Sequence, residues 1–125
     1  MKIEILPSVS QPIYEQIVDQ IKAAIISGEQ KPGDPLPSIR ALARELGISV
    51  ITTKRAYDEL EKEGYLCSVA AKGIFVAEHN SQIIREEHLR QIEAHLLAAL
   101  KLAPACGLQG EDLVQMLRLF ERELP

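Results

Sequence analysis

Two serines stand where helices are expected to begin, and basic residues follow each of them. Ser38 and Ser49 precede runs with helical apolar spacing, and a serine hydroxyl in that place accepts a hydrogen bond from a free first-turn amide. A helix start also carries unpaired N–H groups and the positive end of the helix dipole, which together favour a phosphate. Arg40 follows the first serine, and Lys54 and Arg55 follow the second. Since these three lie off the apolar faces of their helices, the pattern predicts phosphate contacts at both helix starts.

The charge of this segment is opposite to that of the whole chain. The 125 residues include 14 Lys and Arg against 18 Asp and Glu, a formal net charge of −4. An acidic total is unusual for a protein that binds nucleic acid, because neutralising phosphates supplies much of the affinity. Between residues 38 and 57, however, the only acid is Glu45, and the bases are Arg40, Arg44, Lys54 and Arg55. A local basic surface on an acidic chain is compatible with selective DNA binding and weak non-specific binding.

A first helix is expected to position this segment from behind. It opens at Gln11–Pro12, since proline suits the first helical position. Isoleucine then recurs every four residues, at Ile13, Ile17, Ile21 and Ile25. This spacing predicts one buried face on a helix that ends near Gly28, before a turn-rich connector at residues 31–35.

The two helices that begin at the serines are joined by a tight turn at residues 46–49. Gly47 is expected to end the first in the left-handed conformation. The buried positions of that helix are Ile39, Leu42, Ala43 and Leu46. The second helix is expected to run to about Glu63, and its inward positions are Thr53, Ala56, Tyr57 and Leu60.

A β-hairpin is expected after these helices. Residues 65–68 and 73–77 read as two short strands around residues 69–72. Helix, helix, tight turn, helix and hairpin is the order of a winged helix-turn-helix. The sequence therefore predicts a mainly α fold with a small β-hairpin, in which residues 1–78 form the winged helix-turn-helix domain and residues 79–125 a helical dimerisation extension.

The predicted extension consists of two amphipathic helices with a short break at residues 104–107. Their apolar stripes are formed by Leu89, Ile92, Leu96 and Leu100 in the first helix and by Leu113, Leu117 and Phe120 in the second. Two helices of this size cannot enclose a core of their own, so the apolar stripes remain exposed to solvent unless they pack against another surface. Symmetric pairing with a second copy solves this, and we expect a homodimer.

Metal, cofactor and enzyme chemistry find little support in the residues. His79, His88 and His95 include a pair seven residues apart, but no set of three or four ligands with defined spacing accompanies them. Phosphate-cradling glycine loops, H-E-x-x-H and nucleophile motifs are missing from the sequence. Cys67 and Cys106 are far apart and predict neither a disulfide framework nor a zinc site. We expect no metal, no cofactor and no catalysis.

The sequence also lacks the features of a membrane or exported protein. No apolar run approaches the ~20 residues that span a bilayer. The first residues, Met1 to Leu6, contain an acid and lack the long apolar stretch of a signal peptide. We expect a cytoplasmic protein with no membrane contact.

Several segments resemble the GntR-type regulators, in order and at the right separations. They are residues 12–17 (PIYEQI), 26–34 (ISGEQKPGD), 36–43 (LPSIRALA), 56–65 (AYDELEKEGY) and 72–76 (KGIFV). The resemblance covers about residues 10–78, and the tail is similar to the YtrA-like subfamily in length and pattern. Other branches of the family carry a large effector-binding or aminotransferase-like domain, which we do not expect here.

The resemblance implies which residues meet DNA. They come from the two helix starts and from the hairpin, whose tip is expected to approach the minor groove: Ser38, Arg40, Ser49, Val50, Thr52, Lys54, Arg55, Lys72 and Gly73. Four positions depart from the family pattern. Val50 stands where arginine is frequent and Ile51 where a polar residue is frequent, and in the hairpin Ala71 replaces the usual glycine and Ile74 the usual threonine. Valine can still pack on thymine methyl groups.

The resemblance further implies a transcriptional repressor that binds a pseudo-palindromic operator on double-stranded DNA as a homodimer. Control of a neighbouring transport operon is suggested, and an unidentified small-molecule effector is compatible with it. The alternative is a winged-helix protein-interaction module without an operator, which the acidic total charge and the apolar pair Val50–Ile51 favour. Steep salt dependence of DNA binding would distinguish the first hypothesis from the second.

Overall fold

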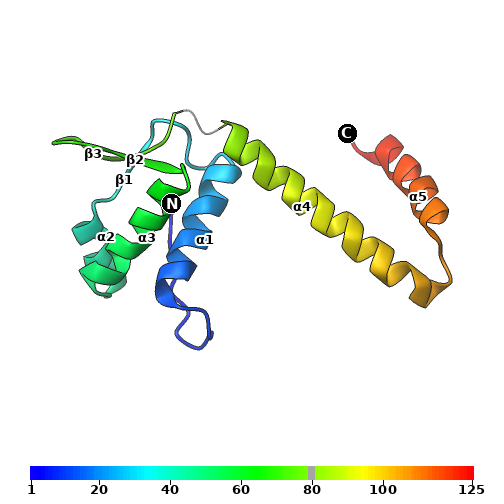
Figure 1. Cartoon of the computed structure of the whole chain (residues 1–125), viewed down its shortest axis with the longest axis horizontal. Helices are drawn as coiled ribbons and strands as arrows, with labels where there is room; N and C mark the ends of the chain where they lie inside the picture. The colour runs from blue at the N-terminus through cyan, green and yellow to red at the C-terminus, as the bar shows by residue number, and fades with distance from the viewer. Residues whose placement is uncertain (79–80) are drawn as a thin grey trace. The chain divides into compact units, whose positions relative to one another are not determined.

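The structure is a computed structural model that describes residues 1–78 and 81–125, and the chain divides into two compact units, Met1–Arg85 and Glu86–Pro125 (Figure 1). The elements in chain order are α1 (Ile13–Ile26), β1 (Pro35–Leu36), α2 (Ile39–Leu46), α3 (Val50–Lys62), β2 (Leu66–Val69), β3 (Gly73–Val76), α4 (Ser81–Leu102), a 3₁₀ turn η1 (Ala103–Cys106) and α5 (Gly110–Glu123). The predicted mainly α fold with a winged helix-turn-helix is confirmed. The predicted domain boundary falls at His79, which lies outside the described residues, and it stays a prediction.

The core of the first unit forms where α1, α3 and the sheet meet. Ile17 and Ile21 of α1, Leu60 of α3 and Val76 of β3 are fully buried. The predicted inward face of α3 is confirmed, because all four of its positions are buried. Ile13, the first position of the α1 stripe, is exposed instead, since it lies in the first turn beyond the edge of this core.

The predicted helix boundaries at the two serines are confirmed. The Ser38 and Ser49 hydroxyls accept hydrogen bonds from Ala41 N–H at 3.1 Å and Thr52 N–H at 3.0 Å, so each serine caps its helix. Gly47 ends α2 with φ 68°, a left-handed conformation that glycine adopts without steric cost. At α1 the prediction is one residue off, because Pro12 occupies the cap position and not the first helical one.

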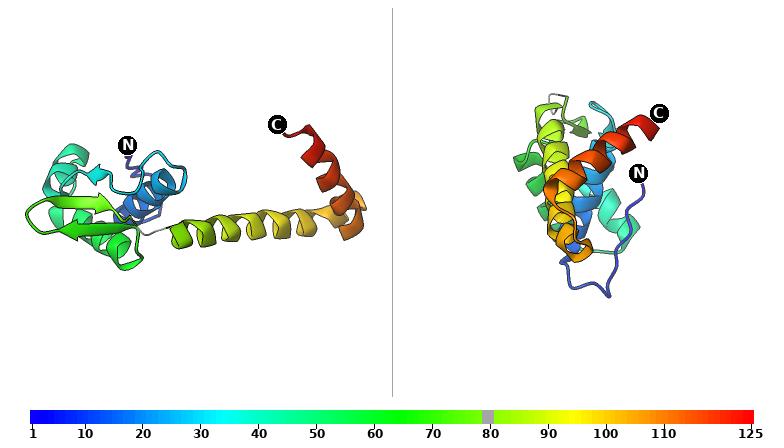
Figure 2. Two further views of the ribbon diagram at one scale, coloured as in Figure 1. Left: turned by 90° about the horizontal axis from the view of Figure 1, so that it is seen from above. Right: turned by 90° about the vertical axis from the view of Figure 1, so that its right-hand side faces the viewer.

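The sheet contains a strand that was not predicted. Its order is β1-β3-β2, all antiparallel, with Leu36 opposite Ile74 and Leu66 opposite Val76. β2 and β3 form the expected hairpin and run side by side in opposite directions (Figure 2). The third strand, β1, consists of Pro35 and Leu36 and ends two residues before Ser38. The sheet therefore links the start of α2 to the hairpin.

The second unit exposes its apolar side chains. Neither α4 nor α5 contains a buried residue. In the described part of this unit, Ala103 of η1 is the one residue that is buried. The two helices and the break between them are as predicted, and Gly107 with φ 72° closes that break. Within the described residues no helix is long and apolar enough to cross a membrane.

Candidate nucleic-acid interface

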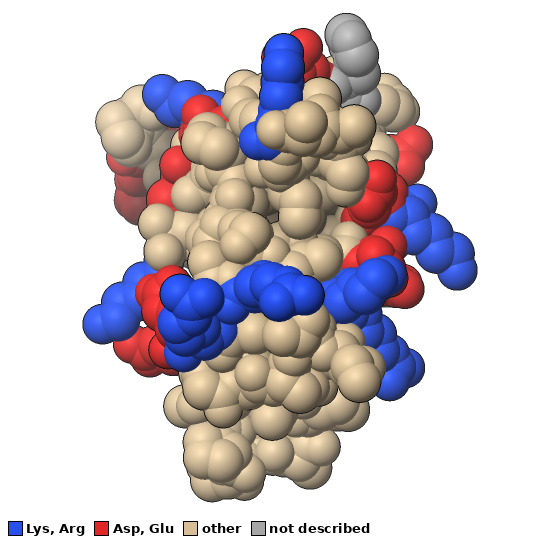
Figure 3. Space-filling model, turned by 90° about the vertical axis from the view of Figure 1, so that its left-hand side faces the viewer, with Lys and Arg blue, Asp and Glu red and all other residues tan. Residues whose placement is uncertain are grey.

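Basic side chains gather on one face of the molecule. Figure 3 shows a band of Lys and Arg across this face, with Asp and Glu toward its edges. The four basic residues singled out between residues 38 and 57, namely Arg40, Arg44, Lys54 and Arg55, are all exposed. Exposed basic side chains attract phosphates even on a protein whose total charge is negative.

The start of α2 and the tip of the hairpin share one groove. Its volume is about 350 Å³, and Ser38, Lys72 and Gly73 are among the residues that line it. The pairing of β1 with β3 explains this proximity, because β1 ends two residues before Ser38 and β3 begins at Gly73. Three of the predicted DNA-contacting residues thus come together although 34 positions separate Ser38 from Lys72 in the numbering of the chain.

The start of α3 presents apolar side chains to solvent. Val50 and Ile51 are exposed, and Ile51 keeps 81% of its surface accessible. The Ser49 hydroxyl donates to Thr52 Oγ1 at 2.8 Å and accepts from the Thr52 amide, so both hydroxyls are engaged within the cap. Thr52 is half-buried. The outward chemistry at this helix start therefore comes from Val50, Ile51 and Lys54.

Lys54 carries a partner that the site analysis of the sequence missed. Its Nζ lies 2.6 Å from Asp58 Oδ2, one turn further along α3, and both side chains are more than half exposed. The spacing of four residues is the usual signal for such a helical ion pair. An exposed pair of this kind is weak, at about 0.3–0.5 kcal/mol, so a phosphate can compete with Asp58 for the ammonium group.

Arg55 is held differently, by an aromatic ring. Its Cζ lies 3.8 Å from the centroid of the Tyr14 ring on α1. This is a cation–π contact between two helices, and it was not predicted from the sequence. No ion pair joins Arg55 to a carboxylate among residues 1–78 and 81–125.

Tyr57 ties α3 to the segment that leads into α2. Its buried hydroxyl donates to the Pro37 carbonyl at 2.8 Å, one residue before the Ser38 cap. Burial, with the negative charge of Glu45 as a smaller contribution, raises the pKa of Tyr57 to about 12. The hydroxyl therefore stays protonated and keeps donating, which ties α3 to the start of α2.

The turn of the hairpin contains a residue in an unfavourable conformation. Lys72 N–H donates to the Val69 carbonyl at 3.0 Å, and Ala71 between them has φ 65°. Residues with a Cβ atom rarely adopt this left-handed region, and glycine adopts it freely. Ala71 therefore adopts its conformation at a steric cost, and Lys72 lies exposed at the tip of the hairpin.

The histidines do not assemble a metal site in the described part of the chain. Groups of three or more His, Cys, Asp or Glu side chains that could hold an ion are missing from residues 1–78 and 81–125. His79 lies outside these residues, and His88 and His95 are exposed on α4. Both cysteines are free thiols.

Comparison with known proteins identifies the arrangement. Residues 13–76, which include both helix starts and the hairpin, match the family described as "Bacterial regulatory proteins, gntR family". The chain belongs to the GntR family. The predicted resemblance is thereby confirmed, and the match covers the helices and the hairpin described above.

Individual GntR relatives extend the match beyond this unit. The HTH-type transcriptional repressor YtrA of Bacillus subtilis is 34% identical over 116 residues, which cover 93% of this chain and 89% of YtrA. The structure of YtrA from Sulfolobus acidocaldarius is 40% identical, with a TM-score of 0.57, over 73% of this chain and 97% of that one. The DNA-binding domain of AraR, solved in complex with operator ORX1, is 29% identical with a TM-score of 0.54 and covers 62% of this chain and 96% of its own.

Proposed function

We propose that this GntR protein is a transcriptional repressor that binds an operator in double-stranded DNA as a homodimer. The observation that carries the proposal is the exposed basic surface built on the capped starts of α2 and α3. Support comes from relatives, since YtrA of Bacillus subtilis is named a transcriptional repressor and the AraR domain was solved with its operator. A protein-interaction module without an operator is the less favoured alternative for the same reason.

The proposed roles of the side chains follow from their positions. Ser38 and Arg40 at the start of α2 bind phosphates, with Lys72 and Gly73 of the hairpin beside the same groove. Val50, Ile51 and Lys54 enter the major groove from α3, where the two apolar side chains pack on thymine methyl groups. We expect an operator rich in thymine at the positions that meet Val50 and Ile51.

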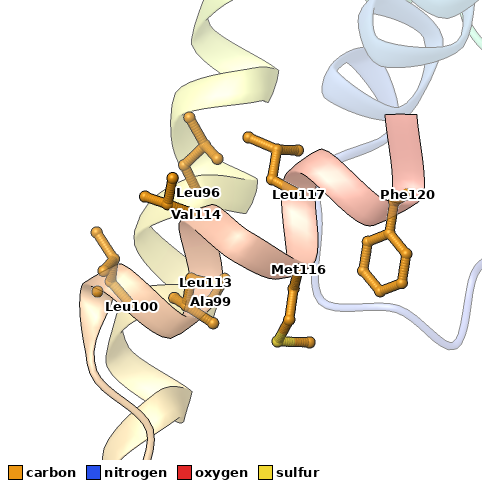
Figure 4. Close-up of a pocket in the computed structure, with 9 residues that line it drawn as sticks. Leu96, Ala99, Leu100, Leu113, Val114, Met116, Leu117 and Phe120 are labelled. Carbon is orange, nitrogen blue, oxygen red and sulfur yellow. The ribbon is translucent and has the colours of Figure 1, made fainter. Parts of the chain in front are cut away.

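A second copy of the chain is proposed to cover the apolar side of the second unit. An apolar groove of about 340 Å³ lies between α4 and α5, as Figure 4 shows. Its lining includes five of the predicted dimerisation residues: Leu96, Leu100, Leu113, Leu117 and Phe120. Leu89 and Ile92, the other two, are exposed on α4. Apolar surface of this extent is rarely left in water, and a symmetric pair of helices buries it from both sides.

The remaining expectations are part of the same proposal. Residues 1–78 act as the DNA-binding domain and residues 79–125 as the dimerisation extension. The protein works in the cytoplasm, on a pseudo-palindromic site whose half-sites are about one helical turn apart. Control of a transport operon and regulation by a small-molecule effector stay predictions.

The test is selection of bound sequences from random duplex DNA with the full-length protein at about physiological salt. A two-fold symmetric site with thymines opposite the α3 starts is the expected result. If no sequence is enriched although the protein is folded and dimeric, the proposed repressor function is wrong. An Arg40→Ala variant should weaken binding to all sequences by a similar factor, and unchanged affinity would remove Arg40 from the phosphate contacts.

A further inference from the structure

We propose that Tyr14 of α1 is a positioning residue for DNA binding, which holds the Arg55 guanidinium ready for a phosphate. This inference rests on the proposed function. It assigns a role to a side chain outside the helix-turn-helix, because Tyr14 lies on the first helix and Arg55 on the third.

The contact between the two side chains is close and defined. Arg55 Cζ stands 3.8 Å from the ring centroid, which places the guanidinium against the ring face. An aromatic face attracts a cation through its quadrupole, and arginine stacks particularly well because it is planar. The N–H donors of a stacked guanidinium lie in its plane, so they remain available to a phosphate.

The ring itself is anchored. Tyr14 is half-buried and packs against the core that α1 shares with α3. Its hydroxyl donates to Glu15 Oε1 at 3.2 Å. A stacking partner fixed in this way limits the rotamers of Arg55 before DNA arrives, and it thereby reduces the entropy that binding would otherwise cost.

Arg55 stacks on the Tyr14 ring although acidic side chains lie nearby. Glu15, Glu59 and Glu63 line the same hollow as Tyr14 and Arg55. Glu63 is paired with Lys22 at 3.0 Å, and Glu15 accepts from Tyr14. Arg55 lies on the ring and forms no ion pair with these three carboxylates in the part of the chain that the structure describes, whereas Lys54 is paired with Asp58.

The experiment measures binding of the full-length protein to a labelled mixed-sequence duplex of about 30 base pairs, from about 50 mM salt upward. Tyr14→Leu keeps apolar bulk at the core and removes the ring face. Tyr14→Phe keeps the apolar bulk and the ring face. Ile13→Ala, at an exposed neighbour outside the hollow, is the matched control. Each variant is also combined with Arg55→Ala, and circular dichroism verifies that all of them fold.

We expect Tyr14→Leu to weaken DNA binding about 3- to 10-fold, the range of a cation–π contact, and Tyr14→Phe and Ile13→Ala to bind like the wild type. Arg55→Ala should lower the slope of log affinity against log salt by about one, and Tyr14→Leu should add no further loss in that background.

Two results would contradict this inference, and they can be told apart. If the wild type binds DNA and Tyr14→Leu weakens binding equally with and without Arg55, or does not weaken it at all, the positioning role is wrong and the proposed function stands. If the folded wild type binds neither this duplex nor any selected sequence, the proposed function fails and this inference fails with it.

Discussion

The two units of this protein use the same sequence pattern with opposite results. In the first unit the isoleucine stripe of α1 is covered by α3 and the sheet, and Ile17 and Ile21 are fully buried. In the second unit α4 and α5 also carry apolar residues at spacings of three and four, yet Leu96 and Leu117 remain about half exposed. A helical apolar stripe predicts that a surface will be covered, but the rest of the fold decides whether the cover lies in the same chain.

The number of available elements explains this difference. Among the described residues, the first unit has three complete helices, three strands and the first turn of α4, and these elements can surround α1 and α3 on several sides. Among the described residues, the second unit has a 3₁₀ turn, α5 and all of α4 beyond its first turn, and two helices cannot enclose a core. The first unit is therefore expected to owe its stability to contacts within one chain, and the second to owe its stability to association.

The largest effect that separates the units is expected from truncating a buried leucine. Leu60→Ala removes a side chain with 0% exposure from the last turn of α3, which should lower the free energy of unfolding by about 3–4 kcal/mol. Urea denaturation followed by circular dichroism measures it. Leu117→Ala, at 53% exposure, is the control and should cost far less at protein concentrations too low for dimers. Equal losses of unfolding free energy in the two variants would contradict the difference between the units.

Placing a charge in the second unit should act on association instead. Leu117→Arg puts an unpaired charge into the apolar groove, and we expect the dimer dissociation constant to rise about 100-fold. Sedimentation velocity over a concentration series gives this constant. Gln115→Arg adds the same charge to α5 outside the groove lining, and it should leave association nearly unchanged. A monomeric wild-type protein would refute the proposed pairing.

The stability of the first unit should depend on pH in the alkaline range, because Tyr57 is buried there. An ordinary tyrosine loses its proton near pH 10, whereas burial raises the pKa of Tyr57 to about 12. Between these values the unfolded chain releases the proton and the folded chain keeps it, so the contribution is fully present below pH 10 and disappears as pH rises toward 12. The loss should reach about 2–3 kcal/mol, as measured by urea unfolding at each pH.

The matched variant for this pH dependence is Tyr57→Phe. It loses the hydrogen bond to Pro37, at about 1 kcal/mol, and should flatten the alkaline decline by the share that belongs to Tyr57. The remaining decline comes from the other titrating groups. A variant that declines as steeply as the wild type would show that the Tyr57 proton does not contribute.

The smallest effect is expected in the hairpin turn. Ala71→Gly removes a Cβ from a residue with φ 65° and should stabilise the first unit by about 0.5–1 kcal/mol. Thermal unfolding measures the change. Ala70→Gly, at the neighbouring turn residue without a positive φ, should be neutral or slightly destabilising because it only adds freedom to the unfolded chain. The reverse order of the two variants would contradict the strain at Ala71.

Features fixed by local chemistry were predictable from the sequence, and features that depend on tertiary packing were not. The caps at Ser38 and Ser49 and the left-handed Gly47 follow from residue type and spacing, and all three are as predicted. The two-residue strand β1 shows no periodicity, and its partner β3 lies about forty residues later in the chain. No short-range pattern reveals such a pairing.

The candidate site divides in the same way. The pair Lys54–Asp58 has the usual spacing of four and could have been inferred from the sequence. The stacking of Arg55 on Tyr14 depends on how α1 crosses α3, which the sequence does not state. The joining of Ser38 with Lys72 and Gly73 in one groove depends on β1 in turn.

The exposed stripes of the second unit have a consequence for how the amount of active protein depends on the amount of chain in the cell. If two copies must meet before both half-sites of an operator are held, the amount of active species at low abundance rises with the square of the amount of chain. Halving the synthesis of the protein would then leave about a quarter of the dimers, by mass action. Gene dosage and proteolysis would accordingly change the output of the regulated promoter more steeply than in proportion.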